Sequence, residues 1–251
     1  MKLKLDAILA PGELPALVRR DRREAVCVVF DILRATSTFV TALHHGAAAV
    51  LPVSEISEAV ALRREHADWL LAGERHGVKI RAAESGGIDF NLGNSPREFT
   101  PETVRGKTIV STTTNGTRAL RACRGSRAVL AASFLNLAAT AAYLQRLQPA
   151  EIILVCAGTG EGVALEDVMA AGALAERLPA AGEATDAVAI ARQTYAGAKA
   201  DLALALSRTM NGRRLSARPE LREDVAYCAR MDVIPLAAVA DGAGCLRGVV
   251  G

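Results

Sequence analysis

A run of six apolar residues, 25–30, constrains this chain most, because it leads directly into a carboxylate, an arginine and three hydroxyls. Apolar residues without interruption over this length predict a strand buried on both faces of a sheet. The polar residues from Asp31 to Thr38 would then lie at the carboxyl end of the strand, where open α/β sheets bind ligands. Residues 35–43 are expected to form a helix whose first turn offers free N–H groups to an anion. The stretch therefore predicts an acid suited to metal binding beside a phosphate-binding helix start.

The same order of strand, polar turn and helix recurs later in the chain. Residues 107–111 and 151–156 are also expected to form strands, and both end in polar turns that contain glycine. If the strands are parallel, these turns meet at one edge of the sheet. We therefore predict an α/β fold with a largely parallel sheet, and the recurrence leaves open a construction from two similar β-α-β units. In the first unit, residues 25–30 and 48–53 are expected to form a parallel pair with a right-handed crossover.

Two stretches between these units contain polar residues in irregular surroundings. Residues 71–77 place an acid and a base, Glu74 and Arg75, between glycines, which predicts a tight loop that presents both side chains. Residues 82–99 contain no convincing helix or strand. Irregular segments of this length inside a compact domain are commonly functional.

The last quarter of the chain is expected to be helical and charged. Its clearest turn signal is Asn211-Gly212, and residues 234–239 are expected to form the last strand. A four-residue spacing places three further side chains close to one helix face. These are Asp224, Cys228 and Asp232.

The composition excludes several classes of protein. A chain of 251 residues suffices for one α/β domain over residues 1–251, and two closely packed lobes remain open. A net charge of +3 is too small for a general nucleic-acid surface. No apolar run approaches the roughly 18 residues that cross a bilayer, and the first residues lack a signal peptide, so we expect a cytoplasmic protein with no membrane partner. The five scattered cysteines indicate neither a disulfide framework nor a zinc site.

Three familiar phosphate chemistries do not fit the sequence. Residues 158–162 are rich in glycine but lack the Gly-Lys-Ser/Thr ending of a P-loop. Cys156 precedes a turn of small residues, yet a cysteine phosphatase would need an arginine where this chain has Gly162. A phosphoaspartyl mechanism would need a second Asp two positions after Asp31, where this chain has Leu33.

The polar residues that remain in these turns point to metal-assisted phosphoryl transfer. Carboxylate oxygens favour Mg²⁺, which commonly takes one or two of them together with waters and substrate phosphate. Arginines suit the bidentate recognition of anions. With water as the acceptor, such a site would be a phosphatase. The residues are the acids Asp31, Glu74, Glu166 and Asp167, the amides Asn94 and Asn115, the arginines Arg34, Arg75 and Arg118, and several threonines.

Short motifs in this order and spacing resemble the 2-phosphosulfolactate phosphatase family, and the resemblance extends from about Asp31 to Asp232. Each motif alone is weak, whereas the ordered set is specific. The motifs are Asp31-Ile-Leu-Arg34-Ala-Thr36, Gly73-Glu74-Arg75, Gly93-Asn94-Ser95-Pro96, Thr113-Thr114-Asn115-Gly116-Thr117-Arg118-Ala119-Leu120, Phe134-Leu-Asn136, Cys156-Ala-Gly158 and Glu166-Asp167.

The resemblance implies a three-layer α/β/α architecture and Mg²⁺-dependent removal of phosphate from 2-phospho-3-sulfolactate, a step toward coenzyme M. Two features differ from the family pattern: Ala164 stands where a hydroxyl residue is expected, and residues 82–89 lengthen the segment before Asn94. The substrate therefore remains open between this compound and another phosphorylated hydroxy acid.

We assign the expected roles as follows. The expected catalytic residues are Asp31, Glu74 and Asp167. The expected metal-binding residues are Asp31, Glu74, Glu166 and Asp167, and the sequence does not decide which of them bind the metal and which orient the attacking water. The substrate-binding residues are Arg34, Thr36, Arg75, Asn94, Ser95, Thr114, Asn115 and Arg118. The cofactor is Mg²⁺ and the partner is a small anionic phosphate ester, with a homo-oligomer left open. The alternative function is a non-catalytic anion- or nucleotide-binding regulatory protein.

Overall fold

The computed structural model describes residues 3–179 and 182–250. Its strands all belong to one sheet of eleven. The strands are Lys4–Ile8 (β1), Ala25–Phe30 (β2), Ala49–Pro52 (β3), Leu70–Arg75 (β4), Val78–Lys79 (β5), Thr108–Thr112 (β6), Ala128–Ala132 (β7), Glu151–Cys156 (β8), Glu183–Ala184 (β9), Leu236–Ala240 (β10) and Leu246–Val250 (β11).

The same residues contain twelve α-helices and short 3₁₀ segments. The α-helices are Leu14–Arg19 (α1), Ala35–His44 (α2), Ile56–Glu65 (α3), Ala82–Ser85 (α4), Pro101–Val104 (α5), Gly116–Ala122 (α6), Leu137–Leu147 (α7), Leu165–Arg177 (α8), Asp186–Ala198 (α9), Leu202–Ser207 (α10), Met210–Ser216 (α11) and Arg222–Cys228 (α12). Within the described residues, none of these helices has both the length and the apolar character needed to cross a lipid bilayer.

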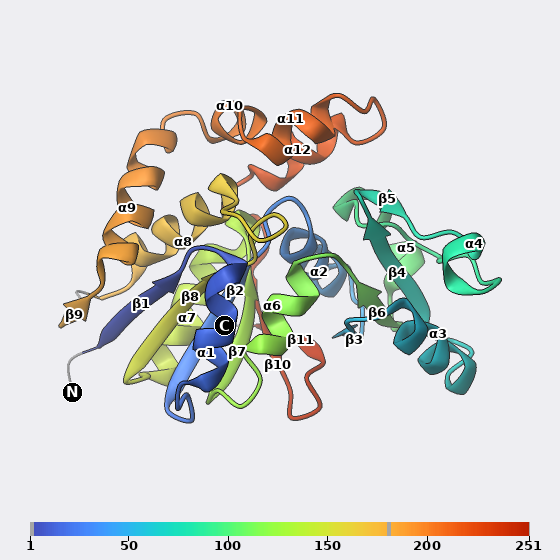
Figure 1. Cartoon of the computed structure of the whole chain (residues 1–251), viewed down its shortest axis with the longest axis horizontal. Coiled ribbons are helices and arrows are strands. Elements are labelled where there is room, and N and C mark those ends of the chain that lie inside the picture. Colours follow the sequence, from blue (N-terminus) through green and yellow to red (C-terminus); the bar gives the residue numbers. More distant parts are fainter. Residues whose placement is uncertain (1–2, 180–181, 251) are drawn as a thin grey trace.

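The sheet consists of two groups of parallel strands joined by an antiparallel hairpin. Its order is β5-β4-β6-β3-β11-β10-β7-β2-β8-β1-β9. One group is β7, β2, β8, β1 and β9, and the other is β4, β6 and β3. Figure 1 shows the two groups on opposite sides of the hairpin formed by β10 and β11. The predicted α/β class with a largely parallel sheet is therefore confirmed.

Strand β2 is buried on both faces, as its apolar run predicts. Val26, Val28 and Phe30 pack into one core with helices α7, α8 and α9. The alternate residues Cys27 and Val29 pack into a second core with α1, α2 and α6. Because successive side chains of a strand point to opposite faces, these two cores place helices on both sides of the sheet. The three-layer α/β/α arrangement follows from this packing.

The expected pairing of residues 25–30 with residues 48–53 is wrong. Strand β2 pairs with β7 and β8, whereas β3 pairs with β6 and β11. The hairpin of β10 and β11 lies between β7 and β3 and is antiparallel to both of them. The hairpin arises because residues 246–250, which carry no clear strand signal, add β11 to the predicted last strand.

Three local expectations also differ from the structure. Glu74 and Arg75 end strand β4 and are not in a loop, because residues 70–73 extend along β6. A Cβ at Gly73 would overlap the Thr112 carbonyl, so this glycine permits close packing of the two strands. Residues 82–99 are mostly irregular but include α4 and the 3₁₀ segment Pro96–Glu98. The expected turn at Asn211-Gly212 is instead part of helix α11.

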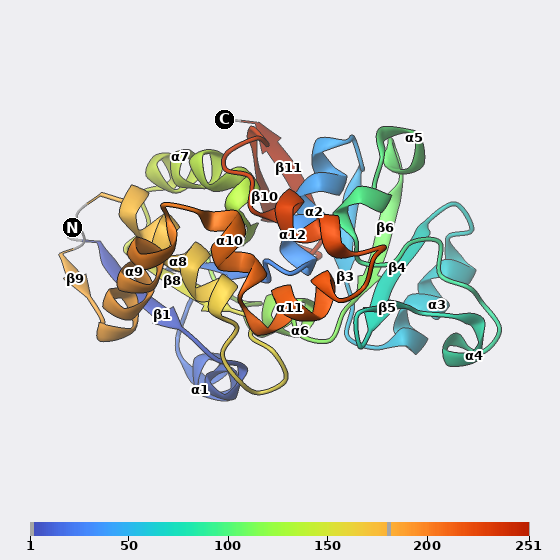
Figure 2. The same cartoon turned by 90° about the horizontal axis from the view of Figure 1, so that it is seen from above.

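Helices α10, α11 and α12 run across the top of the sheet. Figures 1 and 2 show them above α2 and α8, over the region between the two groups of strands. The polar turns that follow β2 and β8 lie beneath them, since α2 and α8 begin at those turns. The helical last quarter of the chain therefore covers the edge at which the sequence predicts a site.

Candidate active site

Asp31 ends the central strand and is held by the start of helix α2. Its Oδ1 accepts a hydrogen bond from the Ala35 N–H at 3.0 Å. Thr36 is fully buried, and its hydroxyl lies 3.0 Å from both the Asp31 amide nitrogen and the Asp31 carbonyl oxygen. Thr36 therefore fixes the Asp31 backbone, while Oδ2 of Asp31 faces Gly116 at the start of α6. A Cβ on Gly116 would lie 2.6 Å from that oxygen.

We predict that Gly116→Ala disturbs the site directly. The added methyl group would also lie 2.7 Å from the Ala35 Cβ, so α6 or Asp31 must move, and overpacking of this kind costs about 1–3 kcal/mol. Denaturant unfolding and turnover should both show a loss. The control is Gly197→Ala in α9, which meets no atom within 4 Å and should be neutral or stabilising by about 0.5–1 kcal/mol. A Gly116→Ala protein as stable and active as wild type would contradict the prediction.

Glu74 connects strand β4 to the turn after β6. Its Oε1 accepts hydrogen bonds from both the amide and the hydroxyl of Thr114, each at 2.9 Å. Its Oε2 accepts the Gly77 N–H at 2.7 Å. The side chain is only 8% exposed. Glu74 therefore holds Thr114 in place and retains acceptor capacity on Oε2 for a water molecule.

Glu166 and Asp167 lie in the first turn of α8 and are nearly inaccessible. Asp167 accepts hydrogen bonds from the Ile32 N–H at 2.8 Å and from the Gly158 N–H at 3.0 Å. It thereby joins the ends of the neighbouring strands β2 and β8. Glu166, 1% exposed, accepts a hydrogen bond from Asn211 of α11 at 2.6 Å. Both carboxylates are positioned by main-chain or amide donors.

These acids form a group of like charges that is only partly offset by Arg34, whose charge lowers the pKa of Asp31. Burial of the side chain and the charges of Glu74 and Glu166 raise the pKa of Asp31 to about 7, against the lowering effect of the Ala35 N–H. Burial, with Asp31 and Glu166 nearby, raises the pKa of Asp167 well above its ordinary value. In residues 3–179 and 182–250, none of the four acids makes an ion pair with Lys, Arg or His. A bound cation would relieve this repulsion.

The predicted amide and hydroxyl residues surround the same turns. Asn115 Nδ2 donates to the carbonyls of Ala157 and Gly160, each at 2.9 Å, and so connects the turns after β6 and β8. The Asn94 carbonyl accepts a hydrogen bond from Thr38 of α2 at 2.9 Å. The turns after β2, β4, β6 and β8 are therefore brought together, although β4 and β6 belong to the other group of strands.

The three predicted arginines lie in different environments. Arg34 is buried and donates to Asp224 of α12 at 2.7 Å and to the Gly77 carbonyl at 3.1 Å. Arg75 donates to the Glu74 carbonyl at 2.7 Å and to Thr112 Oγ1 at 3.0 Å. Arg118 is exposed and pairs with the exposed acid Glu161.

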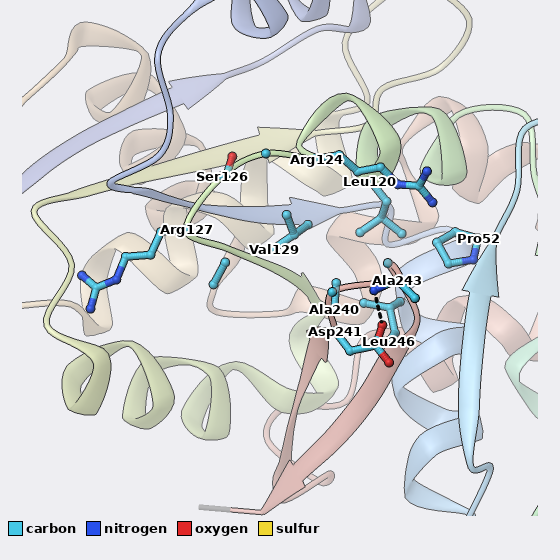
Figure 3. Close-up of a pocket in the computed structure, with 14 residues that line it drawn as sticks. Pro52, Leu120, Arg124, Ser126, Arg127, Val129, Ala240, Asp241, Ala243 and Leu246 are labelled. Carbon is cyan, nitrogen blue, oxygen red and sulfur yellow. Dashed lines mark hydrogen bonds between the residues drawn. The ribbon is translucent and has the colours of Figure 1, made fainter.

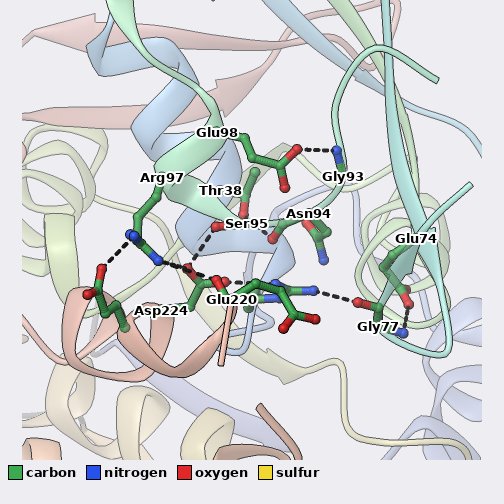
Figure 4. A network of polar contacts seen from close by, with 12 residues as sticks. Thr38, Glu74, Gly77, Gly93, Asn94, Ser95, Arg97, Glu98, Glu220 and Asp224 are labelled. Carbon is green, nitrogen blue, oxygen red and sulfur yellow. Dashed lines mark hydrogen bonds and ion pairs between the residues drawn. The ribbon is translucent and has the colours of Figure 1, made fainter. Parts of the chain in front are cut away.

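Asp224 contacts side chains from two other parts of the chain. Besides Arg34, it accepts a hydrogen bond from Ser95 at 2.7 Å and lies 3.7 Å from Arg97. Figure 4 shows Asp224 between Ser95 and Arg97, with Gly77 and Glu74 on the other side of the network. Ser95, predicted to bind substrate, is therefore occupied by Asp224.

A cavity of about 320 Å³ lies away from the candidate site. It lies between the turn before β7 and the turn that joins β10 to β11, as Figure 3 shows. Its lining includes none of the predicted site residues, and its acid, Asp241, pairs with Arg247. Cys156 is not suited to act as a nucleophile. Burial, and to a smaller extent the charge of Asp167, raises the pKa of its thiol well above the ordinary value.

Comparison with known proteins identifies the family. Residues 13–242 match the family described as 2-phosphosulpholactate phosphatase. The chain belongs to the 2-phosphosulfolactate phosphatase family. This confirms the resemblance that the ordered motifs indicate.

Relatives within the 2-phosphosulfolactate phosphatase family differ in how much of their length is matched. A protein of Thermotoga maritima, named probable 2-phosphosulfolactate phosphatase, is 49% identical over 60% of this chain and 61% of its own length. A protein of Caldanaerobacter subterraneus with the same name is 44% identical over 63% of this chain and 64% of its own length. A third relative with that name, from Trichormus variabilis, is 35% identical over 93% of this chain and 96% of its own length. The match therefore spans less than two thirds of the first two relatives and nearly all of the third.

Two residues at this site have no role in the sequence-based prediction. Asn211 precedes a glycine, and because Asn-Gly is typical of turns, the sequence predicts a turn here and no contact with Glu166. The four-residue spacing predicts that Asp224 shares a helix face with Cys228 but indicates no partner for it. The available signal was a carboxylate on a face that packs into the core, because a buried acid requires a buried cation or several donors.

Proposed function

We propose that this chain is a Mg²⁺-dependent phosphatase that hydrolyses 2-phosphosulfolactate or a closely related phosphorylated hydroxy acid. The observation that carries the proposal is the group of Asp31, Glu74 and Glu166, whose like charges lie together beside the start of helix α2 and which make no ion pair within the described residues. Family membership supports the substrate class, since the relatives are named for this ester. The arrangement places a cation-binding cluster beside the start of helix α2, where the positive end of the helix dipole favours an anion.

The donor set fits Mg²⁺ bound with few protein ligands. Across the described residues, no three His, Cys, Asp or Glu side chains form a complete metal cage. Mg²⁺ commonly uses one or two carboxylates and takes its other ligands from water and substrate phosphate. We assign Asp31 and Glu166 as these carboxylates, because each retains an oxygen that accepts none of the protein hydrogen bonds seen in residues 3–179 and 182–250. When bound, Mg²⁺ would polarise the phosphoryl oxygens and lower the pKa of a coordinated water.

The chain's own residues position the reacting groups. Glu74, fixed by Thr114 and Gly77, is placed to accept a hydrogen bond from the attacking water. Asp167 has both oxygens engaged by backbone N–H groups, so its proposed role is to hold the ends of β2 and β8. Hydrolysis forms a bond between the water oxygen and phosphorus and breaks the P–O bond of the ester. The proton released by the water goes to the leaving alkoxide oxygen, which becomes the hydroxyl of the released hydroxy acid.

The site supports treating residues 1–251 as one functional domain. Asp31 follows β2, and Asp167 lies in α8, which follows β8 of the same group of strands. Glu74 lies in β4 and Thr114 follows β6, and both of these strands belong to the other group. Neither group alone would supply the whole set. The partner that we propose is the small anionic ester itself.

Phosphate release tests the proposal. Purified protein should release inorganic phosphate from 2-phosphosulfolactate with Mg²⁺ and not with excess chelator, and should act more slowly on 2-phospholactate, which lacks the sulfonate. Equal rates on both esters would support the phosphatase activity and contradict a preference for the sulfonate group. No Mg²⁺-dependent release from any phosphorylated hydroxy acid would favour the alternative, a non-catalytic anion- or nucleotide-binding protein.

A further inference from the structure

Asn211 links helix α11 to the acidic group from above. Its Nδ2 donates to Glu166 Oε1 at 2.6 Å and to Thr159 Oγ1 at 2.6 Å. A carboxylate only accepts hydrogen bonds, so the amide nitrogen must face Glu166. Both N–H bonds of this amide are therefore used, one on a buried acid and one on the turn that follows β8.

The position of Asn211 is set by its neighbours in α11. Thr209 caps this helix by accepting the Gly212 N–H on its hydroxyl at 3.0 Å. A Cβ at Gly212 would overlap the Leu206 carbonyl at the end of α10. Gly212 therefore allows α11 to approach α10 closely, and this approach brings Asn211 over Glu166. The Asn-Gly pair serves helix packing and a side-chain contact, not a turn.

The turn after β8 is held from two sides. Asn115 donates to the carbonyls of Ala157 and Gly160 from the start of α6. Asn211 holds Thr159 from α11 on the other side. Because Thr159 and Gly162 pair across this turn, the two amides fix the turn next to Glu166.

Glu166 needs such a donor, because it lies 1% exposed among other acids. Asn211 provides the side-chain hydrogen bond that the structure gives it within residues 3–179 and 182–250. We propose that Asn211 is a positioning residue that orients the Glu166 carboxylate and the turn of residues 158–162, and thereby sets the affinity of the site for Mg²⁺. This proposal rests on the proposed metal-dependent function and adds a residue on α11 to it.

The proposal predicts a change in metal response that a purely structural role would not produce. Asn211→Leu keeps the approximate volume but removes the donor, and Asn211→Asp keeps the shape but puts a second acceptor against Glu166. Loss of a hydrogen bond that orients a metal ligand typically costs 10- to 100-fold in metal affinity or activity. Both variants should therefore need about 10- to 100-fold more Mg²⁺ for half-maximal turnover, with much of kcat recovered at saturating Mg²⁺.

A second readout uses no turnover at all. Without substrate, Mg²⁺ should raise the thermal midpoint of the wild-type protein, and the Mg²⁺ concentration that gives half of this rise should increase in both variants. Thr159→Val removes the hydroxyl that accepts the second hydrogen bond of Asn211, and it should increase this Mg²⁺ concentration less than the Asn211 variants do. Arg214→Ala is the control, because this neighbour on α11 is exposed, and it should respond as wild type does.

The outcomes separate the two proposals. A folded Asn211→Leu or Asn211→Asp protein with wild-type Mg²⁺ dependence in both measurements would overturn the role of Asn211 and leave the proposed function intact. Should Asn211→Leu fail to fold, the isosteric Asn211→Asp decides alone. A wild-type protein without any response to Mg²⁺ in either measurement would overturn both proposals.

Discussion

Replacing Asp31 by Asn is expected to remove nearly all turnover at limiting Mg²⁺ while leaving the fold intact. The amide oxygen can still accept the Ala35 N–H, so the start of α2 is preserved. The side chain loses the charge that makes it a strong ligand for a hard cation. Outer-sphere changes already cost 10- to 100-fold, so loss of a direct ligand should lower kcat/KM by more than about a hundredfold.

The metal-free stability of the same variant should move in the opposite direction. Asp31 lies near the negative charges of Glu74 and Glu166, and a neutral amide removes that repulsion. The thermal midpoint of Asp31→Asn without Mg²⁺ should therefore equal or exceed that of wild type, while the rise on adding Mg²⁺ should shrink.

Asp6→Asn is the matched control for Asp31→Asn. Asp6 lies on β1, two strands from β2 in the same sheet, and pairs with Arg20 at 2.7 Å. This change should lower stability slightly and leave the Mg²⁺ dependence unchanged. Wild-type turnover of Asp31→Asn at limiting Mg²⁺ would show that Asp31 is not a metal ligand.

The strands that run through the middle of the sheet were predictable from the sequence. The bounds of β2 and β8 match the strands predicted at residues 25–30 and 151–156. These strands are buried on both faces, so the hydrophobic signal begins and ends where the strand does. The acids at the strand ends could be named for the same reason, because a polar side chain directly after such a run lies at the edge of the sheet.

The arrangement of the two groups of strands was not predictable in the same way. It depends on β11, whose residues Leu246–Val250 include exposed positions and a glycine and so give no clear period. Strand β3 meets β11 at a single register pair, Val50 with Leu246. Pairing over this distance in sequence is decided by packing of the whole molecule and leaves no local signal.

The partners of the predicted side chains were beyond sequence reasoning for a related reason. Arg34 and Asp224 are 190 residues apart, and Asn211 is 45 residues from Glu166. The Asn-Gly signal at 211–212 follows from the freedom of glycine in turns. Here a packing constraint prevails, because only glycine fits against the Leu206 carbonyl.

Breaking the buried pair of Arg34 and Asp224 is expected to have the largest effect on stability. The two side chains are 3% and 0% exposed. Removing Asp224 would leave Arg34 buried without its ion-pair partner, and removing Arg34 would leave Asp224 with the partly exposed Arg97 at 3.7 Å. Such changes cost about 3–5 kcal/mol. Asp224→Ala and Arg34→Met should each lower the free energy of unfolding by this amount, measured by denaturant titration without substrate.

An exposed ion pair on the same helix provides the control. Glu223 is 71% exposed and pairs with Arg97, which is 39% exposed. Pairs of this kind contribute about 0–1 kcal/mol, so Glu223→Gln should change stability by no more than that. A loss below about 1 kcal/mol for Asp224→Ala would contradict the assignment of a buried, fully paired charge.

The double variant Arg34→Met with Asp224→Leu decides whether Arg34 also binds the substrate. Replacing both members of a buried pair with apolar residues of similar volume often restores much of the stability lost by either change. The folded double variant can then be assayed for turnover. If Arg34 contributes a charged hydrogen bond to a substrate anion, worth about 1.5–3 kcal/mol, kcat/KM for 2-phosphosulfolactate should fall roughly ten- to a hundredfold. If Arg34 only holds α12 to the turn at Gly77, the double variant should keep the wild-type kcat/KM. The second result would remove Arg34 from the substrate-binding residues and leave Arg75 and Arg118, from the predicted set, for the anionic groups of the substrate.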